Sequence, residues 1–103
     1  MKQVLITGAY GFCARYLAKR LSDNHNIAVI GTDIVDEKSN NECYSSYYKV
    51  DITKSDDVSM LVSEVCPDTI FHLAGIVRGQ PDIIYSVNLM GGVNQLEAAK
   101  KYS

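Results

Sequence analysis

Short apolar runs alternate with helical repeats along this chain. The apolar run at residues 4–6 is followed by Gly8, and apolar residues then recur at offsets of 3, 4 and 7 from Ala14, which is the helical period. We therefore predict a strand over residues 4–6, a glycine turn, and a helix over residues 11–23.

The same alternation continues toward the carboxyl end. A nearly continuous apolar run over 27–33 is typical of a parallel strand buried on both faces. We then expect Ser55 to cap a helix, with Asp56 and Asp57 in its first turn, where acidic side chains are favourable. We expect the helix that Ser55 caps to end at Pro67. The remaining predicted elements are a polar loop over 34–46, a short strand over 47–50, a strand over 69–73 and a long helix from Pro81 to about Lys101.

This order of elements indicates an α/β fold. Crossovers between parallel strands are right-handed, so we expect a parallel sheet with helices on both faces and strand order 3-2-1-4. This is a partial Rossmann-type sheet of about four strands, whose ligand lies at the carboxyl ends of the strands, near the first strand.

Gly8, Gly11 and Ala14 make a G-x-x-G-x-x-A spacing between the first predicted strand and helix. Glycines allow a sharp turn and let a pyrophosphate approach the backbone without a Cβ in the way. The unpaired N–H groups and the dipole of the helix N-terminus favour an anion at the same place. We therefore predict that this turn binds a dinucleotide; the alternative is an ordinary strand-to-helix turn that contains glycine.

Composition narrows the range of partners. The chain has 103 residues, of which 47% are hydrophobic, and this suits one small domain. A net charge of −2 without a basic run argues against a nucleic-acid partner, and no apolar run approaches the ~18 residues of a membrane span. No signal peptide precedes the first predicted strand, and the three cysteines are widely spaced, so we expect reduced thiols in a cytoplasmic protein.

The glycine spacing, with Thr7 before it and Phe12 after the second glycine, resembles the extended short-chain dehydrogenase/reductase superfamily, which includes NAD-dependent epimerases and dehydratases. Residues 72–75, His-Leu-Ala-Gly, look like the H-L-A-[AG] signature of that family, and residues 88–99 resemble its N-x-x-G-x-x-N-x-L-E-A-A helix. The resemblance implies that residues 1–103 are an NAD-binding Rossmann domain.

Asp33 closes the second predicted strand, 25 residues after Gly8. A carboxylate there accepts hydrogen bonds from the adenosine ribose hydroxyls and repels the extra phosphate of NADP, so NAD is favoured and NADP less so. Lys38 lies nearby and is able to weaken that preference, and the alternative for Asp33 is a turn residue at a strand end. We include Ile34 among the cofactor-binding residues.

Several further roles are implied only by the resemblance. Asp51 and Ile52 hold the adenine, through a hydrogen bond to its amino group and through packing; the alternative for Asp51 is a loop or capping residue. Asn88 supports the wall near the nicotinamide, or else lies on a helix surface. The small residues of the signature let the backbone lie against the ribose and pyrophosphate, and its cofactor-binding members are Leu73, Ala74 and Gly75. We expect His72 to be a packed strand residue rather than a catalyst.

Two aromatic residues flank the second glycine. We expect Phe12 to pack under the sheet at the start of the helix. Tyr10 either covers the pyrophosphate or is an exposed loop aromatic. Both are candidate cofactor-binding residues.

The chain lacks the catalytic motif of the family that it resembles. No tyrosine is followed four residues later by lysine, so the Tyr-x-x-x-Lys pair is absent and we assign no catalytic residue. We therefore expect the amino-terminal, cofactor-binding portion of an oxidoreductase, which acts on a sugar nucleotide or a similar hydroxylated substrate in a longer parent. The alternative is a free-standing nucleotide-binding or regulatory module. An open sheet edge would also make the chain a homo-oligomer.

Overall fold

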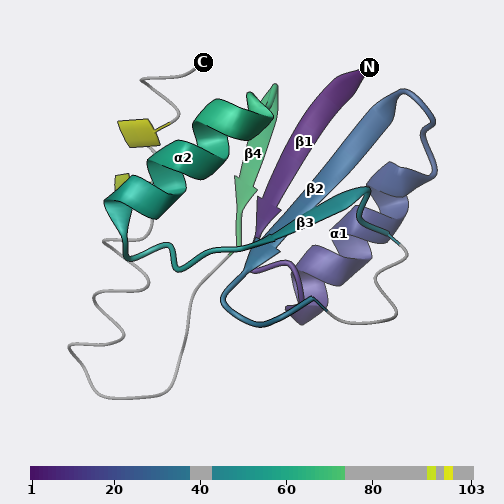
Figure 1. Cartoon of the computed structure of the whole chain (residues 1–103). Helices are drawn as coiled ribbons and strands as arrows, with labels where there is room; N and C mark the ends of the chain where they lie inside the picture. Colours follow the sequence, from purple (N-terminus) through teal and green to yellow (C-terminus); the bar gives the residue numbers. More distant parts are fainter. Residues whose placement is uncertain (38–42, 74–92, 95–96, 99–103) are drawn as a thin grey trace.

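Four parallel strands form the centre of the structure, a computed structural model that describes residues 1–37, 43–73, 93–94 and 97–98 (Figure 1). The strand order is β3-β2-β1-β4, which confirms the predicted order. The strands are β1 (Lys2–Thr7), β2 (Ile27–Asp33), β3 (Ser46–Lys49) and β4 (Thr69–His72), and the helices are α1 (Phe12–Ser22) and α2 (Ser55–Val65). All three strand pairs are parallel, so the four carboxyl ends lie at one edge of the sheet.

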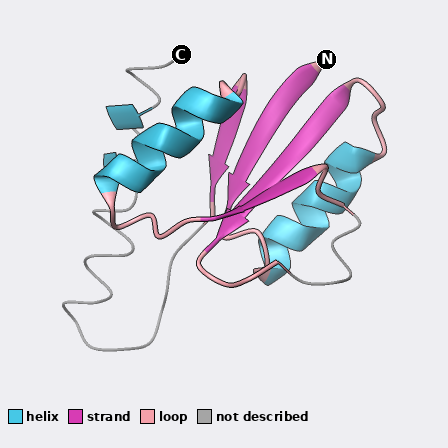
Figure 2. Cartoon of the chain, viewed as in Figure 1, coloured by secondary structure: helices cyan, strands magenta, loops and turns pink. Residues whose placement is uncertain are grey.

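The two helices cover opposite faces of the sheet. Leu5 and Ile30 are register partners on β1 and β2, and both belong to the buried cluster that contains α2. Val4 and Val29, one position earlier on each strand, belong to the cluster that contains α1. Successive side chains of a strand point to opposite faces, so the predicted arrangement with helices on both faces is confirmed. Figure 2 shows α1 and α2 flanking the strands.

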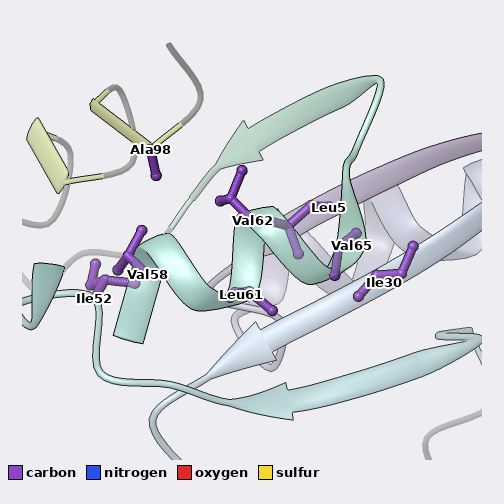
Figure 3. Close-up of a cluster of buried hydrophobic side chains, with 8 residues drawn as sticks. All are labelled: Leu5, Ile30, Ile52, Val58, Leu61, Val62, Val65 and Ala98. Carbon is purple, nitrogen blue, oxygen red and sulfur yellow. The ribbon is translucent and has the colours of Figure 1, made fainter. Parts of the chain in front are cut away.

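The α2 side holds the larger apolar side chains. Val58, Leu61, Val62 and Val65 follow the helical period and are all buried (Figure 3). They pack with Ile52 and Ala98 as well as with the sheet. Val58 has no exposed surface.

The fully buried residues that α1 contributes to its side of the sheet are small, because both are alanines. Ala14 and Ala18 are buried, and they pack with Val4, Ile6 and Val29. Phe12, in contrast, is 87% exposed, so the prediction that it packs under the sheet is wrong. Two residues correspond to about 200° of helical rotation, which places Phe12 on the side of α1 opposite Ala14.

The start of α2 differs from the prediction by one residue. Ser55 is the first helical residue rather than the cap, and Lys54 precedes it without a side-chain capping bond. The Val58 N–H donates to the Lys54 carbonyl oxygen at 3.1 Å, which begins the helix at that point. Asp56 and Asp57 lie in the first turn, as predicted.

Most of the helix expected from Pro81 to about Lys101 lies outside the described residues. Residues 93–94 and 97–98 are helical. Across the part of the chain that the structure describes, no helix combines the length and the apolar character needed to cross a membrane.

Candidate functional site

A tight glycine turn joins β1 to α1. Gly8 has φ 68°, in the left-handed region that glycine adopts without strain. The Gly11 N–H donates to the Gly8 carbonyl oxygen at 2.9 Å, and a Cβ on Gly11 would lie 3.2 Å from that same oxygen. The backbone therefore folds closely on itself between the two predicted glycines.

The N-terminus of α1 opens onto this turn. Gly11 is the N-cap and has no side chain to accept a hydrogen bond, and the first helical bond runs from the Arg15 N–H to the Gly11 carbonyl oxygen at 3.0 Å. The helix itself supplies no acceptor for the N–H groups of residues 12–14. No acidic residue lies in this first turn, so nothing there opposes the attraction of the helix dipole for an anion.

The side chain of Asp33, the last residue of β2, is hydrogen-bonded to the glycine turn. The Tyr10 N–H donates to Asp33 Oδ2 at 3.0 Å, and the Ile34 N–H donates to Asp33 Oδ1 at 2.7 Å. The two candidates that the sequence placed 25 residues apart, Gly8 and Asp33, thus belong to one constellation. Ile34 itself is 59% exposed beside this carboxylate.

Asp51 lies one strand further along the same edge. The Val50 N–H donates to the Asp33 carbonyl oxygen at 2.9 Å, which brings the backbone before Asp51 beside Asp33. Asp51 Oδ1 accepts from the Thr53 hydroxyl at 2.7 Å and the Thr53 N–H at 3.0 Å, and these bonds lower the pKa of Asp51. Asp51 therefore closes a turn, as its alternative interpretation proposed; its adenine contact stays a prediction.

The side chain of Ile52 faces the core. It is 7% exposed and packs with the α2 cluster, which leaves little of its side chain for a ligand. The predicted contact of Ile52 with adenine stays a prediction, and the residue has a packing role that we did not expect.

The end of β4 is anchored to the end of β1. The Leu73 N–H donates to Thr7 Oγ1 at 3.0 Å, and that oxygen lies 2.9 Å from His72 Nδ1. Burial lowers the pKa of His72, and its Nε2 atom is buried without a hydrogen-bond partner among the described residues. His72 is accordingly a packed strand histidine, as predicted, while Leu73 is 43% exposed at the same edge.

Tyr10 is not an exposed loop aromatic. Its ring packs edge-on to Tyr44, with centroids 6.3 Å apart, and lies against Tyr47, with centroids 5.1 Å apart. A role of Tyr10 in covering a pyrophosphate stays a prediction. The exposed ring of Phe12 lies at the helix start, so a contact of Phe12 with a cofactor also stays a prediction.

Three predicted site residues, Ala74, Gly75 and Asn88, lie outside the described residues. Asn94 belongs to the helix motif, but the motif alone predicts no contact for it. Its Nδ2 atom donates to the Ile52 carbonyl oxygen at 2.8 Å and ties the last described helical residues to the turn after β3. Among the described residues, no group of three or more histidine, cysteine, aspartate or glutamate side chains is placed to hold a metal ion.

This geometry places the N-terminus of α1 and the Asp33 carboxylate together at the carboxyl edge of a parallel sheet. The sequence profile of the NAD dependent epimerase/dehydratase family matches residues 4–103. A decarboxylating sterol-4-alpha-carboxylate 3-dehydrogenase of Schizosaccharomyces pombe is 28% identical over 107 residues, which cover 100% of this chain and 31% of that protein.

Solved structures agree with the sequence match. L-threonine dehydrogenase of Clostridium difficile has a TM-score of 0.83 at 29% identity, and the match covers 99% of this chain and 34% of the dehydrogenase chain. UDP-glucose 4-epimerase of Thermus thermophilus, in complex with NAD, has a TM-score of 0.84 at 25% identity, covering 97% of this chain and 34% of its own. The chain thus spans about a third of the length of these similar proteins.

Proposed function

The chain belongs to the NAD dependent epimerase/dehydratase family, and from this premise we propose that residues 1–103 form an NAD-binding domain. The glycine turn and the first turn of α1 receive the pyrophosphate, and Asp33 receives the adenosine ribose. In a longer parent the domain would supply the cofactor for hydride transfer, with a sugar nucleotide or a similar hydroxylated compound as substrate.

One observation carries this proposal: the Tyr10 N–H within the glycine turn donates to the Asp33 carboxylate at 3.0 Å. A pyrophosphate site and a ribose site must lie a few bonds apart to hold one dinucleotide. The hydrogen bond joins the two candidate sites directly, in addition to the pairing of β1 with β2 that places their carboxyl ends side by side.

The same carboxylate supports a preference for NAD over NADP. Asp33 lies at the strand end where the ribose of a dinucleotide is held, and its negative charge disfavours a ribose 2′-phosphate. Lys49, at the end of β3, is paired with Asp36 at 2.8 Å, so its charge is directed to that carboxylate rather than to Asp33.

The three free thiols, Cys13, Cys43 and Cys66, agree with the cytoplasmic location that we include in the proposal.

Isothermal calorimetry of the purified chain with NAD, and with NADP in parallel, tests the proposal. We expect heat from NAD and weaker or no heat from NADP. In an NMR titration the amide signals of Phe12, Cys13 and Ile34 should shift together, because they surround the proposed phosphate and ribose positions. A folded chain that gives neither heat nor shifts would refute NAD binding.

A second candidate is a nucleotide-binding or regulatory module without chemistry. Residues 1–103 contain no Tyr-x-x-x-Lys pair, so we assign no catalytic residue to them under either candidate. The two candidates differ in the gene: a reading frame that continues beyond codon 103 into that motif supports the enzyme. NAD binding together with a stop codon at that point supports the module.

A further inference from the structure

Tyr44 reaches the glycine turn from the segment before β3. It is 8% exposed, and its hydroxyl donates to the Ala9 carbonyl oxygen at 2.5 Å. Burial raises the pKa of Tyr44 to about 12, so the hydroxyl keeps its proton and remains a donor at neutral pH. The bond joins residues 35 positions apart, and one of them lies inside the proposed phosphate-binding turn.

The ring of Tyr44 occupies a gap that exists because residue 31 is glycine. A Cβ on Gly31 would lie 2.8 Å from Tyr44 Cδ1 and 2.9 Å from Ala9 Cβ, distances that carbon atoms do not tolerate. The ring is thus wedged between the backbone of β2 and the glycine turn. Next to it, the Ser45 N–H donates to the Val29 carbonyl oxygen at 2.7 Å and fixes the segment that carries the ring.

The remaining bonds of the turn come from its own backbone and from the end of β2. The Ala9 N–H donates to the Thr32 carbonyl oxygen at 3.0 Å, and the Gly11 N–H donates to Gly8 at 2.9 Å. With the bond from Tyr10 to Asp33, these contacts fix the N–H groups of residues 9–11. The Ala9 carbonyl is held from outside the turn, by the hydroxyl of Tyr44.

We propose that Tyr44 is a positioning residue for diphosphate binding: by holding the Ala9 carbonyl and filling the gap at Gly31, it keeps the glycine turn in the shape that exposes the α1 N–H groups. The inference rests on the proposed NAD-binding function. Because the hydroxyl of Tyr44 bonds to the Ala9 carbonyl of the turn, this hydroxyl acts on the phosphate part of the ligand and not on the adenosine part.

Tyr44→Phe tests this, because it keeps the ring and removes the hydroxyl. Binding of ADP and of adenosine to the 103-residue chain is measured by NMR titration, at a temperature where circular dichroism shows the variant to be folded. We expect ADP to bind about fivefold more weakly, the effect of one lost hydrogen bond, and adenosine to bind as before. Tyr16→Phe is the matched control, because it removes a hydroxyl from a residue that is 64% exposed on α1.

An equal loss for ADP and adenosine would show a general structural role and overturn the inference, as would unchanged ADP binding. If the unaltered chain binds neither ADP nor NAD, the proposed function fails and the inference fails with it. If Tyr44→Phe does not fold, amide hydrogen exchange in the unaltered chain decides instead. The hydrogen bonds of the Gly11 and Ser45 N–H groups should open at similar rates, because Tyr44 couples the two segments. An opening rate at Gly11 about tenfold or more above that at Ser45 would overturn the inference.

Discussion

The Asp33 carboxylate connects two parts of the molecule before any ligand is present. One of its oxygens accepts from the Tyr10 N–H and the other from the Ile34 N–H. A carboxylate oxygen has a second lone pair, so the hydroxyls of a ribose are still able to donate to it. Two backbone bonds thus set the orientation of the carboxylate toward a ligand.

Asp33→Asn keeps the shape of this side chain and removes its charge. We expect NAD to bind about tenfold to a hundredfold more weakly, because hydrogen bonds to a charged acceptor are lost. NADP binding should fall less, because a repulsion disappears at the same time. Parallel calorimetric titrations measure the NAD-to-NADP affinity ratio; Asp23→Asn, at the far end of α1, is the control, and an unchanged ratio would contradict the assignment of Asp33.

His72 predicts a dependence of stability on pH. Burial lowers its pKa in the folded chain below the usual 6.5, so the unfolded chain binds more protons in the interval below pH 6.5. The free energy of unfolding should therefore fall as the pH drops from 6.5 toward the folded-state pKa. His72→Asn removes this group, and urea denaturation at several pH values should show a shallower fall; His25→Asn, in an exposed turn, should keep the slope near that of the unaltered chain.

At the scale of elements, the apolar pattern predicts most of the fold because the core is made of periodic residues. The strand at β2 follows from a nearly continuous apolar run, and the buried side of α2 follows from the helical period. The wrong predictions concern residues outside that periodicity. Phe12 is the first residue of α1, and the apolar period does not decide which way a side chain at a helix start faces. The start of α2 is set one residue before Ser55 by the turn that Asp51 closes.

Tyr44 shows why part of the site could not be predicted. Its partners are a carbonyl 35 residues earlier and the bare face of Gly31, and neither leaves a periodic or motif signal in the sequence. The glycines and Asp33 could be predicted because their spacing is set by a strand, a turn and a helix. Contacts made by side chains across the fold are set by three-dimensional packing and have no such spacing along the chain.

Leu61 on α2 tests the packing of the larger core. It is 3% exposed, and Leu61→Ala should lower the free energy of unfolding by about 2–4 kcal/mol through lost burial and a residual cavity. Urea denaturation measures the change. Met60→Ala is the matched control, because Met60 is the neighbouring residue and 65% exposed; a similar loss in both variants would show that α2 does not pack as described.

At the scale of the molecule, the two outer strands of the described sheet differ in character. The β3 edge carries Lys49, whose charge discourages strand addition, beside Tyr47 and Tyr48, whereas β4 presents Phe71, 36% exposed, followed by Leu73, 43% exposed. Within the described residues β4 pairs only with β1. Among the described strands, β3 thus carries a lysine on its edge and β4 does not.

We predict that the chain self-associates through β4. Sedimentation at increasing protein concentration should show a rising average mass, and Phe71→Lys should shift the onset to about tenfold higher concentration, because it adds an edge charge. Met60→Lys changes an exposed residue on α2 and serves as the control. A single monomeric species at high concentration would refute the prediction.

The position of β1 in the sheet also constrains how the chain folds during synthesis. β1 is the first of the four described strands to be made, yet it lies between β2 and β4, and its pairing with β4 joins Thr7 to His72. A chain that emerges amino end first can bring β2 against β1 early, but the other side of β1 waits until β4 has been translated. Such parallel, long-range pairing is slow relative to local hairpins, and it leaves an aggregation-prone strand edge open in the meantime. Of the four described strands, the one that leads into the glycine turn is thus begun first and completed last.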